Sequence, residues 1–207
     1  MTTAIRADQA AIAEWIRPGA SVLDLGCGDG ALLAHLQETR GIRGYGVENA
    51  PENVIACLAR GVNVIQIDLD AGLSGFDTGS FDHVILSQTL QAMQNTSSVL
   101  MEMLRVGREG IVSFPNFGYW RNRVQVLLGR MPVSPDLPHS WHDTPNVHLC
   151  TLQDFEDLCA GLDARVRERQ VLTNGHEINV LPNLLGSVAL YRVSGPTPLP
   201  AAPALRA

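Results

Sequence analysis

Short apolar runs alternate along most of the chain with helical patterns of apolar residues. Runs bounded by glycine or polar residues predict strands at 21–25, 44–48, 62–69, 81–87 and 110–114. Two later runs predict the last strands at 164–172 and 187–193. The third run, VNVIQIDL, is rich in β-branched residues, which strengthens the strand interpretation there.

Helices are predicted in the intervals between these strands. Residues 31–36 begin a helix that Gly41 stops, and Pro51 opens a helix that Gly61 closes. Further helices are expected within 1–19, after the cap residues 95–98, around Val124, Leu127 and Leu128 up to Gly129, and after the capping box of Thr151 and Asp154. Residues 130–150 are rich in proline and show no period, which is typical of functional or mobile loops.

The order of these elements predicts a doubly wound α/β fold. Strands that alternate with helices run parallel and are joined by right-handed crossovers, so helices cover both faces of the sheet. In such a fold a ligand lies outside the carboxyl ends of the strands, where the strand order reverses.

Composition narrows the class of protein. The chain has 207 residues, of which 45% are hydrophobic and 17% charged, and we expect one domain at 1–194 with a disordered tail at 195–207. No run approaches the ~18 apolar residues of a membrane helix, and the first residues lack the pattern of a secretory signal. We therefore expect a cytoplasmic protein without membrane contact, with four reduced cysteines that form no CxxC pair. A net charge of −6 argues against a nucleic-acid partner.

The motif with the clearest chemistry is VLDLGCGDG at 22–30, where three glycines follow a predicted strand and open a helix. Glycine permits a tight turn and lets a ligand approach the backbone. Glu48 ends the next strand, 22 residues after Gly26, where a carboxylate can accept hydrogen bonds from ribose hydroxyls. Asp68 ends the third strand, on the adenine side of such a crevice.

Two ligand classes contain a nucleoside that could be held in this way: a dinucleotide and S-adenosylmethionine. A dinucleotide loop has the spacing GxGxxG, whereas residues 26–30 read GxGxG. Asp24 lies two positions before Gly26, and its carboxylate would repel a pyrophosphate but suits a cationic methionyl group. The sequence therefore predicts S-adenosylmethionine or its demethylated product, S-adenosylhomocysteine, as the ligand.

This pattern resembles motif I of the class I methyltransferases. The resemblance implies a three-layer Rossmann-like fold with a mostly parallel seven-stranded sheet and an antiparallel last strand. It also implies that Glu48 binds the ribose, that Asp68 lies near the adenine amine, and that Ser87 and Gln88 flank the sulfonium. The predicted cofactor-binding residues are Asp24, Leu25, Gly26, Cys27, Gly28, Gly30, Glu48, Asn49, Asp68, Leu69, Ser87 and Gln88.

A closer resemblance extends over about residues 5–190. Five segments are similar to the MetW family of methionine biosynthesis proteins: GCGDGALLAHL, GVNVIQIDLDAGL, FDHVILSQTLQAM, GIVSFPNFGYWRNR and HDTPNVHLCTLQDFEDLC. The methyltransferase fold alone does not explain two parts of this resemblance, PNFGYWRNR and TPNVHLCT. The resemblance implies a role in methionine biosynthesis, with a MetX-type homoserine O-acyltransferase as partner.

The residues give a mixed answer on methyl transfer, and no catalytic residue is assigned. Amino-methylating enzymes of this fold often carry an Asn/Asp-Pro-Pro-aromatic motif after the fourth strand, where this chain reads SQTLQ. His83 lies within a predicted strand and is more typical of a packed residue than of a base. His142 and His148 lie in the irregular segment, where they could act as bases or could hydrogen-bond the segment to the domain.

Three functions are consistent with these residues. The main hypothesis is an accessory or regulatory subunit of the acyltransferase that binds S-adenosylmethionine. The alternative is an active S-adenosylmethionine-dependent methyltransferase that acts on a small molecule. A third hypothesis is an interaction module whose nucleoside site is vestigial.

Other side chains permit further interpretations, each with a plainer alternative. Cys27 could be a thiol activated at a helix N-terminus, although a small side chain that fills space near the cofactor is favoured. A metal site is not expected, because the spacing of the following residues matches no zinc pattern: His139, His142, Asp143, His148 and Cys150. The basic and aromatic group after the fifth strand suits a protein interface or a solvated helix face better than nucleic acid: Trp120, Arg121, Arg123 and Arg130.

Overall fold

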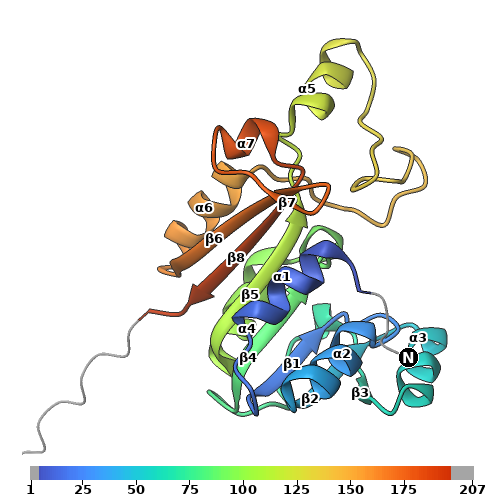
Figure 1. Cartoon of the computed structure of the whole chain (residues 1–207), viewed down its shortest axis with the longest axis vertical. Helices are drawn as coiled ribbons and strands as arrows, with labels where there is room; N and C mark the ends of the chain where they lie inside the picture. The colour runs from blue at the N-terminus through green and yellow to red at the C-terminus, as the bar shows by residue number, and fades with distance from the viewer. Residues whose placement is uncertain (1–4, 197–207) are drawn as a thin grey trace, which may run out of the picture.

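A computed structural model describes residues 5–196, which form one eight-stranded sheet (Figure 1). The strand order is β3-β2-β1-β4-β5-β8-β6-β7. The strands are β1 (Ser21–Leu25), β2 (Arg43–Glu48), β3 (Asn63–Gln66), β4 (Phe81–Ser87), β5 (Gly107–Pro115), β6 (Arg165–Thr173), β7 (His176–Glu177) and β8 (Val188–Ser194). Strands β1 to β5 run parallel, and β8 is antiparallel to both of its neighbours. The predicted Rossmann-like α/β fold with an antiparallel last strand is confirmed.

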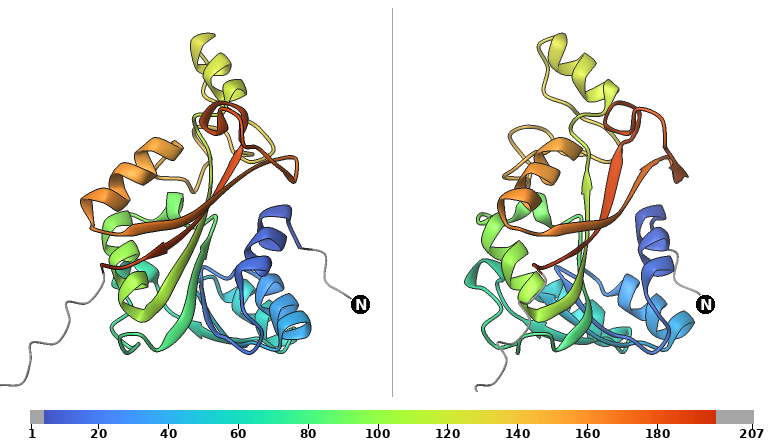
Figure 2. Two further views of the ribbon diagram at one scale, coloured as in Figure 1. Left: turned by 60° about the vertical axis from the view of Figure 1, so that its left-hand side comes forward. Right: turned by 90° about the vertical axis from the view of Figure 1, so that its left-hand side faces the viewer.

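Helices cover both faces of this sheet (Figure 2). They are α1 (Ala7–Trp15), α2 (Ala31–Arg40), α3 (Pro51–Ala59), α4 (Thr96–Val106), α5 (Trp120–Leu127), α6 (Leu152–Gly161) and α7 (Pro182–Leu185), with the 3-10 turns η1 (Leu69–Ala71) and η2 (Leu90–Ala92). Buried side chains of α1, α2 and α3 form one hydrophobic cluster. Those of α4 and α6 form the other, so the sheet separates two cores.

Helix ends follow the signals in the sequence. Gly41 ends α2 in the left-handed conformation, with φ of 62°. Asn95 caps α4 by accepting a hydrogen bond from the Ser98 N–H at 3.2 Å. Thr151 and Asp154 form the predicted capping box of α6.

The strands differ from the sequence prediction in three main respects, apart from shifts of one residue at other strand ends. The sheet has eight strands rather than seven, because the two-residue β7 pairs with the end of β6. The third strand covers residues 63–66 and not 62–69, because the side chain of Asp68 accepts a hydrogen bond from the Asp70 N–H and starts η1. The fifth strand is longer than predicted and begins at Gly107.

Helix α5 and the irregular segment after it do not cover the sheet. In both views they extend beyond the carboxyl ends of β4 and β5, apart from the two helical layers (Figures 1 and 2). Residues 131–150 contain no regular element apart from an isolated bridge between Ser134 and Leu137, as the sequence predicts. Most of the predicted tail, residues 197–207, lies outside the described residues. None of the helices within residues 5–196 is long and apolar enough to cross a membrane.

Candidate functional site

Each of the three glycines in the loop after β1 is required for a different structural reason. All have positive φ, with values of 69° at Gly26, 55° at Gly28 and 76° at Gly30, which other residues rarely adopt. A Cβ atom at Gly26 would lie 2.6 Å from the Cγ2 atom of Thr89, and one at Gly30 would lie 2.9 Å from the Cys57 Sγ atom. At Gly28 only the backbone conformation requires glycine, since no atom lies within 4 Å of a Cβ there.

The carboxylate of Glu48 ties this loop to the end of β2. Its Oε2 atom accepts a hydrogen bond from the Gly28 N–H at 2.9 Å. Its Oε1 atom accepts hydrogen bonds from the N–H groups of Asn49 and Ala50, each at 2.9 Å. Glu48 is buried, so these contacts fix both the loop and the entry to α3. The Oε2 atom keeps a lone pair for one further donor.

Asp24 is a buried carboxylate without a full set of partners. It lies on β1 with 2% of its surface exposed, and its Oδ1 atom has no hydrogen-bond partner. Burial raises the pKa of Asp24 to about 7, while Arg6 opposes this shift and Glu48 adds to it. An unpartnered carboxylate at this depth can be stabilised by a cationic group placed beside it.

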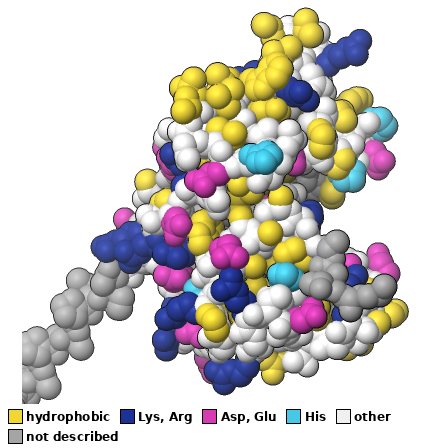
Figure 3. All heavy atoms as spheres, viewed as in Figure 1, with side chains coloured by type: hydrophobic (Ala, Val, Ile, Leu, Met, Phe, Trp, Pro, Cys, Tyr) yellow, Lys and Arg dark blue, Asp and Glu magenta, His cyan; other side chains and the backbone are white. Residues whose placement is uncertain are grey.

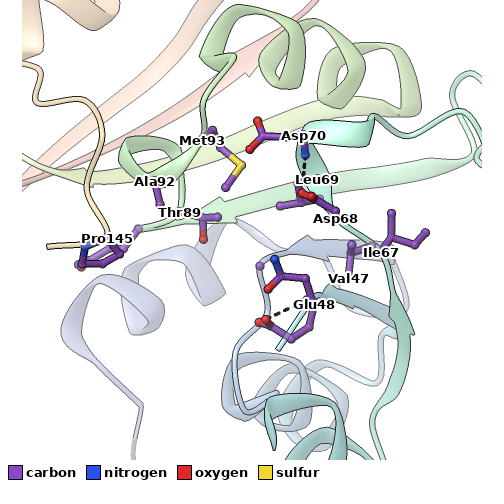
Figure 4. A pocket seen from close by; sticks show the side chains of 13 residues that line it. Val47, Glu48, Ile67, Asp68, Leu69, Asp70, Thr89, Ala92, Met93 and Pro145 are labelled. Carbon is purple, nitrogen blue, oxygen red and sulfur yellow. Dashed lines mark hydrogen bonds between the residues drawn. The ribbon is translucent and has the colours of Figure 1, made fainter. Parts of the chain in front are cut away.

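A pocket of about 410 Å³ opens at the carboxyl ends of β1, β2 and β4 (Figure 4). This volume is in the usual range for small-molecule sites. Glu48 and Val47 lie on one side of it, with Asp68 and Leu69 near the start of η1, and Thr89, Ala92 and Met93 lie across from them. Pro145 reaches the pocket from the irregular segment.

The pocket brings together half of the predicted cofactor residues. Gly26, Glu48, Asn49, Asp68, Leu69 and Gln88 line it. The other predicted residues act around it. Leu25 is part of the core, Gly28 and Gly30 shape the loop, and Asp24 lies buried beneath.

Ser87 points into a polar cluster that joins the end of β4 to helix α1. Asp8 of α1 is buried, and its Oδ2 atom accepts hydrogen bonds from Gln88 Nε2 at 3.3 Å and from the hydroxyl of Ser113 at 3.3 Å. Arg6 donates to both Asp8 and Ser87, each at 3.0 Å. Gln88 itself has φ of 51°, a strained conformation for a residue other than glycine. The N-terminal helix is therefore anchored beside the pocket.

Several residues that line the pocket lie outside the predicted set. They are Val47, Ile67, Asp70, Thr89, Ala92, Met93 and Pro145. Residues 89–93 follow β4 directly, so their position after a strand end was an available signal. Asp8 gave no such signal, because only the packing of α1 brings it to the sheet.

Cys27 is not an activated thiol. Its Sγ atom lies 3.7 Å from that of Cys57, and both side chains are buried. Burial raises the pKa of Cys27, with Asp24 acting in the same direction. The interpretation of a thiolate stabilised by the helix N-terminus is therefore wrong, and Cys27 fills space behind the loop.

The three histidines considered as bases occupy different positions. His83 is buried on β4, and its register partner is Val22 near the start of β1, on the side away from the pocket. His148 ties the irregular segment to the domain, because its backbone N–H donates to the Gln91 carbonyl at 3.0 Å and its ring contacts the Gln94 carbonyl at 3.4 Å. His142 is exposed beside Trp141. Within residues 5–196, no three His, Cys, Asp or Glu side chains are grouped as metal ligands would be.

Solved structures share this fold at low sequence identity. A chain from the complex of the Haloferax volcanii Trm112 methyltransferase activator with a methyltransferase matches with a TM-score of 0.67 and 19% identity, over 91% of this chain and 89% of that one. An S-adenosylmethionine-dependent methyltransferase from Thermotoga maritima matches with a TM-score of 0.65 and 15% identity, over 90% and 86%. The [4+2]-cyclase SpnF matches with a TM-score of 0.66 and 16% identity, over 91% and 80%. These matches show the methyltransferase fold alone, and the cyclase illustrates that the fold does not fix the reaction.

Sequence comparison is more specific. A family model described as methionine biosynthesis protein MetW matches residues 6–193. The chain is also 44% identical over 174 residues to the bifunctional methionine biosynthesis protein MetXA/MetW of Rhodopirellula baltica. That match covers 79% of this chain and 28% of the relative, so the chain spans less than a third of the relative's length. With a family model matched over nearly all of its described residues, this chain belongs to the MetW family of methionine biosynthesis proteins.

Proposed function

We propose that this chain binds S-adenosylmethionine or S-adenosylhomocysteine in the pocket beside Glu48, and that it acts as an accessory, regulatory subunit of a homoserine O-acyltransferase. The observation that carries the ligand is the arrangement of Asp24, Glu48 and the glycine loop. The partner follows from membership of the MetW family and from the double name of the Rhodopirellula relative.

Residues in the pocket, together with the nearby Asp24, fit the chemical groups of this ligand. The unpartnered Oδ1 atom of Asp24 suits the cationic methionyl end. The remaining lone pair of Glu48 Oε2 suits a ribose hydroxyl. Leu69 and Met93 offer apolar surface for a purine, and Asp68 offers a carboxylate beside them for its exocyclic amine.

A regulatory role fits the same residues better than a catalytic role, for which no residue is assigned. Methyl transfer needs an acceptor held in line with the methyl group and, for many acceptors, a base. Of the histidines considered as bases, His83 lies on the side of the sheet away from the pocket, and His148 holds the irregular segment in place. A bound nucleoside can instead change a partner's activity if the ligand binds two states of the complex with different affinities.

The Rhodopirellula relative supports the proposal that the partner is an acyltransferase of the MetX type. Its printed name joins MetXA to MetW in one polypeptide, and the match leaves most of that polypeptide outside the region similar to this chain. Domains that are fused in one protein commonly act together, so the separate chain is proposed to act with a separate acyltransferase of the MetX type.

The test is homoserine acyl transfer by the acyltransferase of the same organism, measured with and without this chain and across S-adenosylmethionine concentrations. Stimulation by the chain supports an accessory subunit, and a further change with ligand supports regulation. The variant Glu48→Ala should lose the ligand effect, while the exposed control Glu38→Ala should keep it. Acyl transfer that is the same with and without the chain would contradict the proposal.

The alternative of an active methyltransferase is separated by a second assay. The chain is incubated with S-adenosylmethionine and either acyl-homoserine pathway metabolites or cell extract, and S-adenosylhomocysteine is quantified. Turnover that depends on an acceptor and is lost in Glu48→Ala would favour the methyltransferase. A vestigial site would give neither turnover nor binding by titration calorimetry.

A further inference from the structure

Helix α5 carries the most exposed apolar side chains of the helices in the described region. Leu127 is 85% exposed, and Leu128, which directly follows the helix, is 72% exposed. Figure 3 shows hydrophobic side chains gathered at this end of the molecule, over α5 and the segment that follows it. The exposed apolar side chains there are Trp120, Val124, Val126, Leu127, Leu128, Met131, Val133 and Trp141, which we call the α5 patch.

The α5 patch has no partner within residues 5–196. The faces of the sheet are covered by α1, α2 and α3 on one side and by α4 and α6 on the other, and α5 stands apart from both layers (Figure 2). A shallow groove of about 430 Å³ runs beside the helix and is lined by Phe117, Arg123, Val126 and Leu127, among others. A contiguous apolar surface that is this exposed marks an interaction site.

The stability of α5 also points to a partner. An eight-residue helix is too short to be stable in water on its own propensity, so it depends on contacts. Polar contacts hold both of its turns: Asn122 is buried and donates to the Asn116 carbonyl at 3.2 Å, and Gln125 Oε1 accepts a hydrogen bond from the Val133 N–H at 3.1 Å. The apolar side chains of the second turn, with Leu127, are left in solvent. A partner that covers them would add the apolar contacts that the helix lacks there.

Charge selects the chemistry of this partner. Helix α5 and its flanks, residues 116–130, contain Arg121, Arg123 and Arg130 and no acidic residue, whereas Asp136 and Asp143 lie in the later part of the segment that carries the patch. Arg121 lies over the Trp120 ring at 5.4 Å, and Arg123 donates to the Gly118 carbonyl, so two of the cations frame the apolar surface. The complementary surface is an apolar groove with carboxylates at its rim.

We propose that the α5 patch is the surface that docks into the homoserine O-acyltransferase, in an apolar groove rimmed by carboxylates. This inference rests on the proposed function. It places both sites along the carboxyl edge of the parallel strands, with the ligand pocket at the ends of β1, β2 and β4 and the docking helix after β5. Pro145 lines the ligand pocket and belongs to the irregular segment that follows α5, so one segment of the chain runs between the two sites.

The experiment measures complex formation between this chain and the acyltransferase of the same organism by sedimentation velocity and calorimetry. The variant Leu127→Asp/Leu128→Asp places two charges on the patch. The control Ile55→Asp/Leu58→Asp places two charges at positions on α3 that are 66% and 61% exposed. We expect the patch variant to weaken the Kd at least tenfold and the control to change it less than twofold. Both should keep the thermal unfolding midpoint of the wild type, since these side chains are exposed.

A second variant tests the charge argument. Arg121→Glu/Arg130→Glu should weaken the complex and make its Kd less sensitive to salt than that of the wild type. Equal affinity of wild type and patch variant would overturn the docking surface while leaving the partnership intact. A wild-type chain that forms no complex would instead overturn the proposed function. Self-association that the patch variant abolishes would show a second copy as the occupant and overturn the inference.

Discussion

The Oε2 atom of Glu48 accepts a hydrogen bond from the backbone N–H of Gly28 at 2.9 Å, across 20 positions of the sequence. The sequence assigns both residues to the ligand, one through its carboxylate and one through its lack of a side chain. Their contact means that Glu48 also holds the glycine loop in shape. Binding and loop stability are therefore coupled through one side chain.

Replacing Glu48 should affect stability as well as ligand affinity. In Glu48→Ala three backbone N–H groups lose a charged acceptor, so we expect the free energy of unfolding to fall by about 1–3 kcal/mol. Affinity for S-adenosylmethionine should fall at least tenfold. Urea unfolding and calorimetry measure the two effects. The exposed control Glu38→Ala should change neither, and wild-type affinity in Glu48→Ala would contradict the ribose role.

The ligand-free protein should lose stability through Asp24 as the pH rises. Burial raises the pKa of this carboxyl from 3.8 to about 7, so the folded state holds a proton that the unfolded state has released between these values. Stability then falls with increasing pH across this window. The variant Asp24→Asn lacks the titration, so the unfolding midpoint of the variant relative to the wild type should increase from pH 4.5 to pH 7.5. A constant difference would rule out the raised pKa.

Ligand binding should show the opposite dependence on pH. A cationic group beside Asp24 favours its ionised form, so affinity for S-adenosylmethionine should rise between about pH 5.5 and pH 7, by up to tenfold per unit. Calorimetry in buffers with different ionisation enthalpies should detect a released proton. Asp24→Asn should bind more weakly at pH 7 and show a flat profile. A profile in this variant that matches the wild type would place the cation elsewhere.

The glycine loop separates a steric requirement from a backbone requirement. Gly26→Ala places a Cβ atom against Thr89, whereas Gly28→Ala meets no atom within 4 Å. We expect Gly28→Ala to cost about 1 kcal/mol of stability from backbone strain, and Gly26→Ala to cost more. Thr89→Ala should recover part of the extra loss in a double mutant. Equal losses in the two single variants, measured by thermal unfolding, would contradict the close packing of Gly26 on Thr89.

His83 should make the protein sensitive to acid. Burial lowers the pKa of His83 below 6.5, although Glu109 lies 3.5 Å from its Nδ1 atom and opposes the shift. The unfolded chain therefore binds a proton more readily, and stability is lost as the pH falls through 6.5. The variant His83→Leu should lose less stability than the wild type between pH 7 and pH 5. A steeper loss in the variant would show that the charged ring is stabilised by Glu109.

The sequence predicts the sheet and the glycine loop because these depend on local patterns. Apolar runs, glycine stops and capping residues each act within a few positions, which is why α2, α4 and α6 begin or end where predicted. The third strand was predicted too long because an Asx contact at Asp68 competes with pairing at the edge of the sheet.

The rest of the site depends on contacts between distant elements. Asp8 meets Ser113 across 105 positions, and no local pattern marks such a pair. Pro145 reaches the pocket through a segment without periodicity. The exposed position of Leu127 likewise depends on how α5 leaves the sheet, which its helical period does not reveal.

The position of β8 has a consequence for the synthesis of the protein. Residues 188–194 form β8, which lies between β5 and β6. One edge of β5 and one edge of β6 therefore stay unpaired until β8, the last described strand, is in place. On the ribosome the N-terminal part, from β1 to β5, can assemble first, while β6 emerges without its neighbour. Unpaired strand edges promote association with other chains, so premature termination before residue 188 should yield an aggregating fragment. Completion of the described sheet therefore depends on the synthesis of β8.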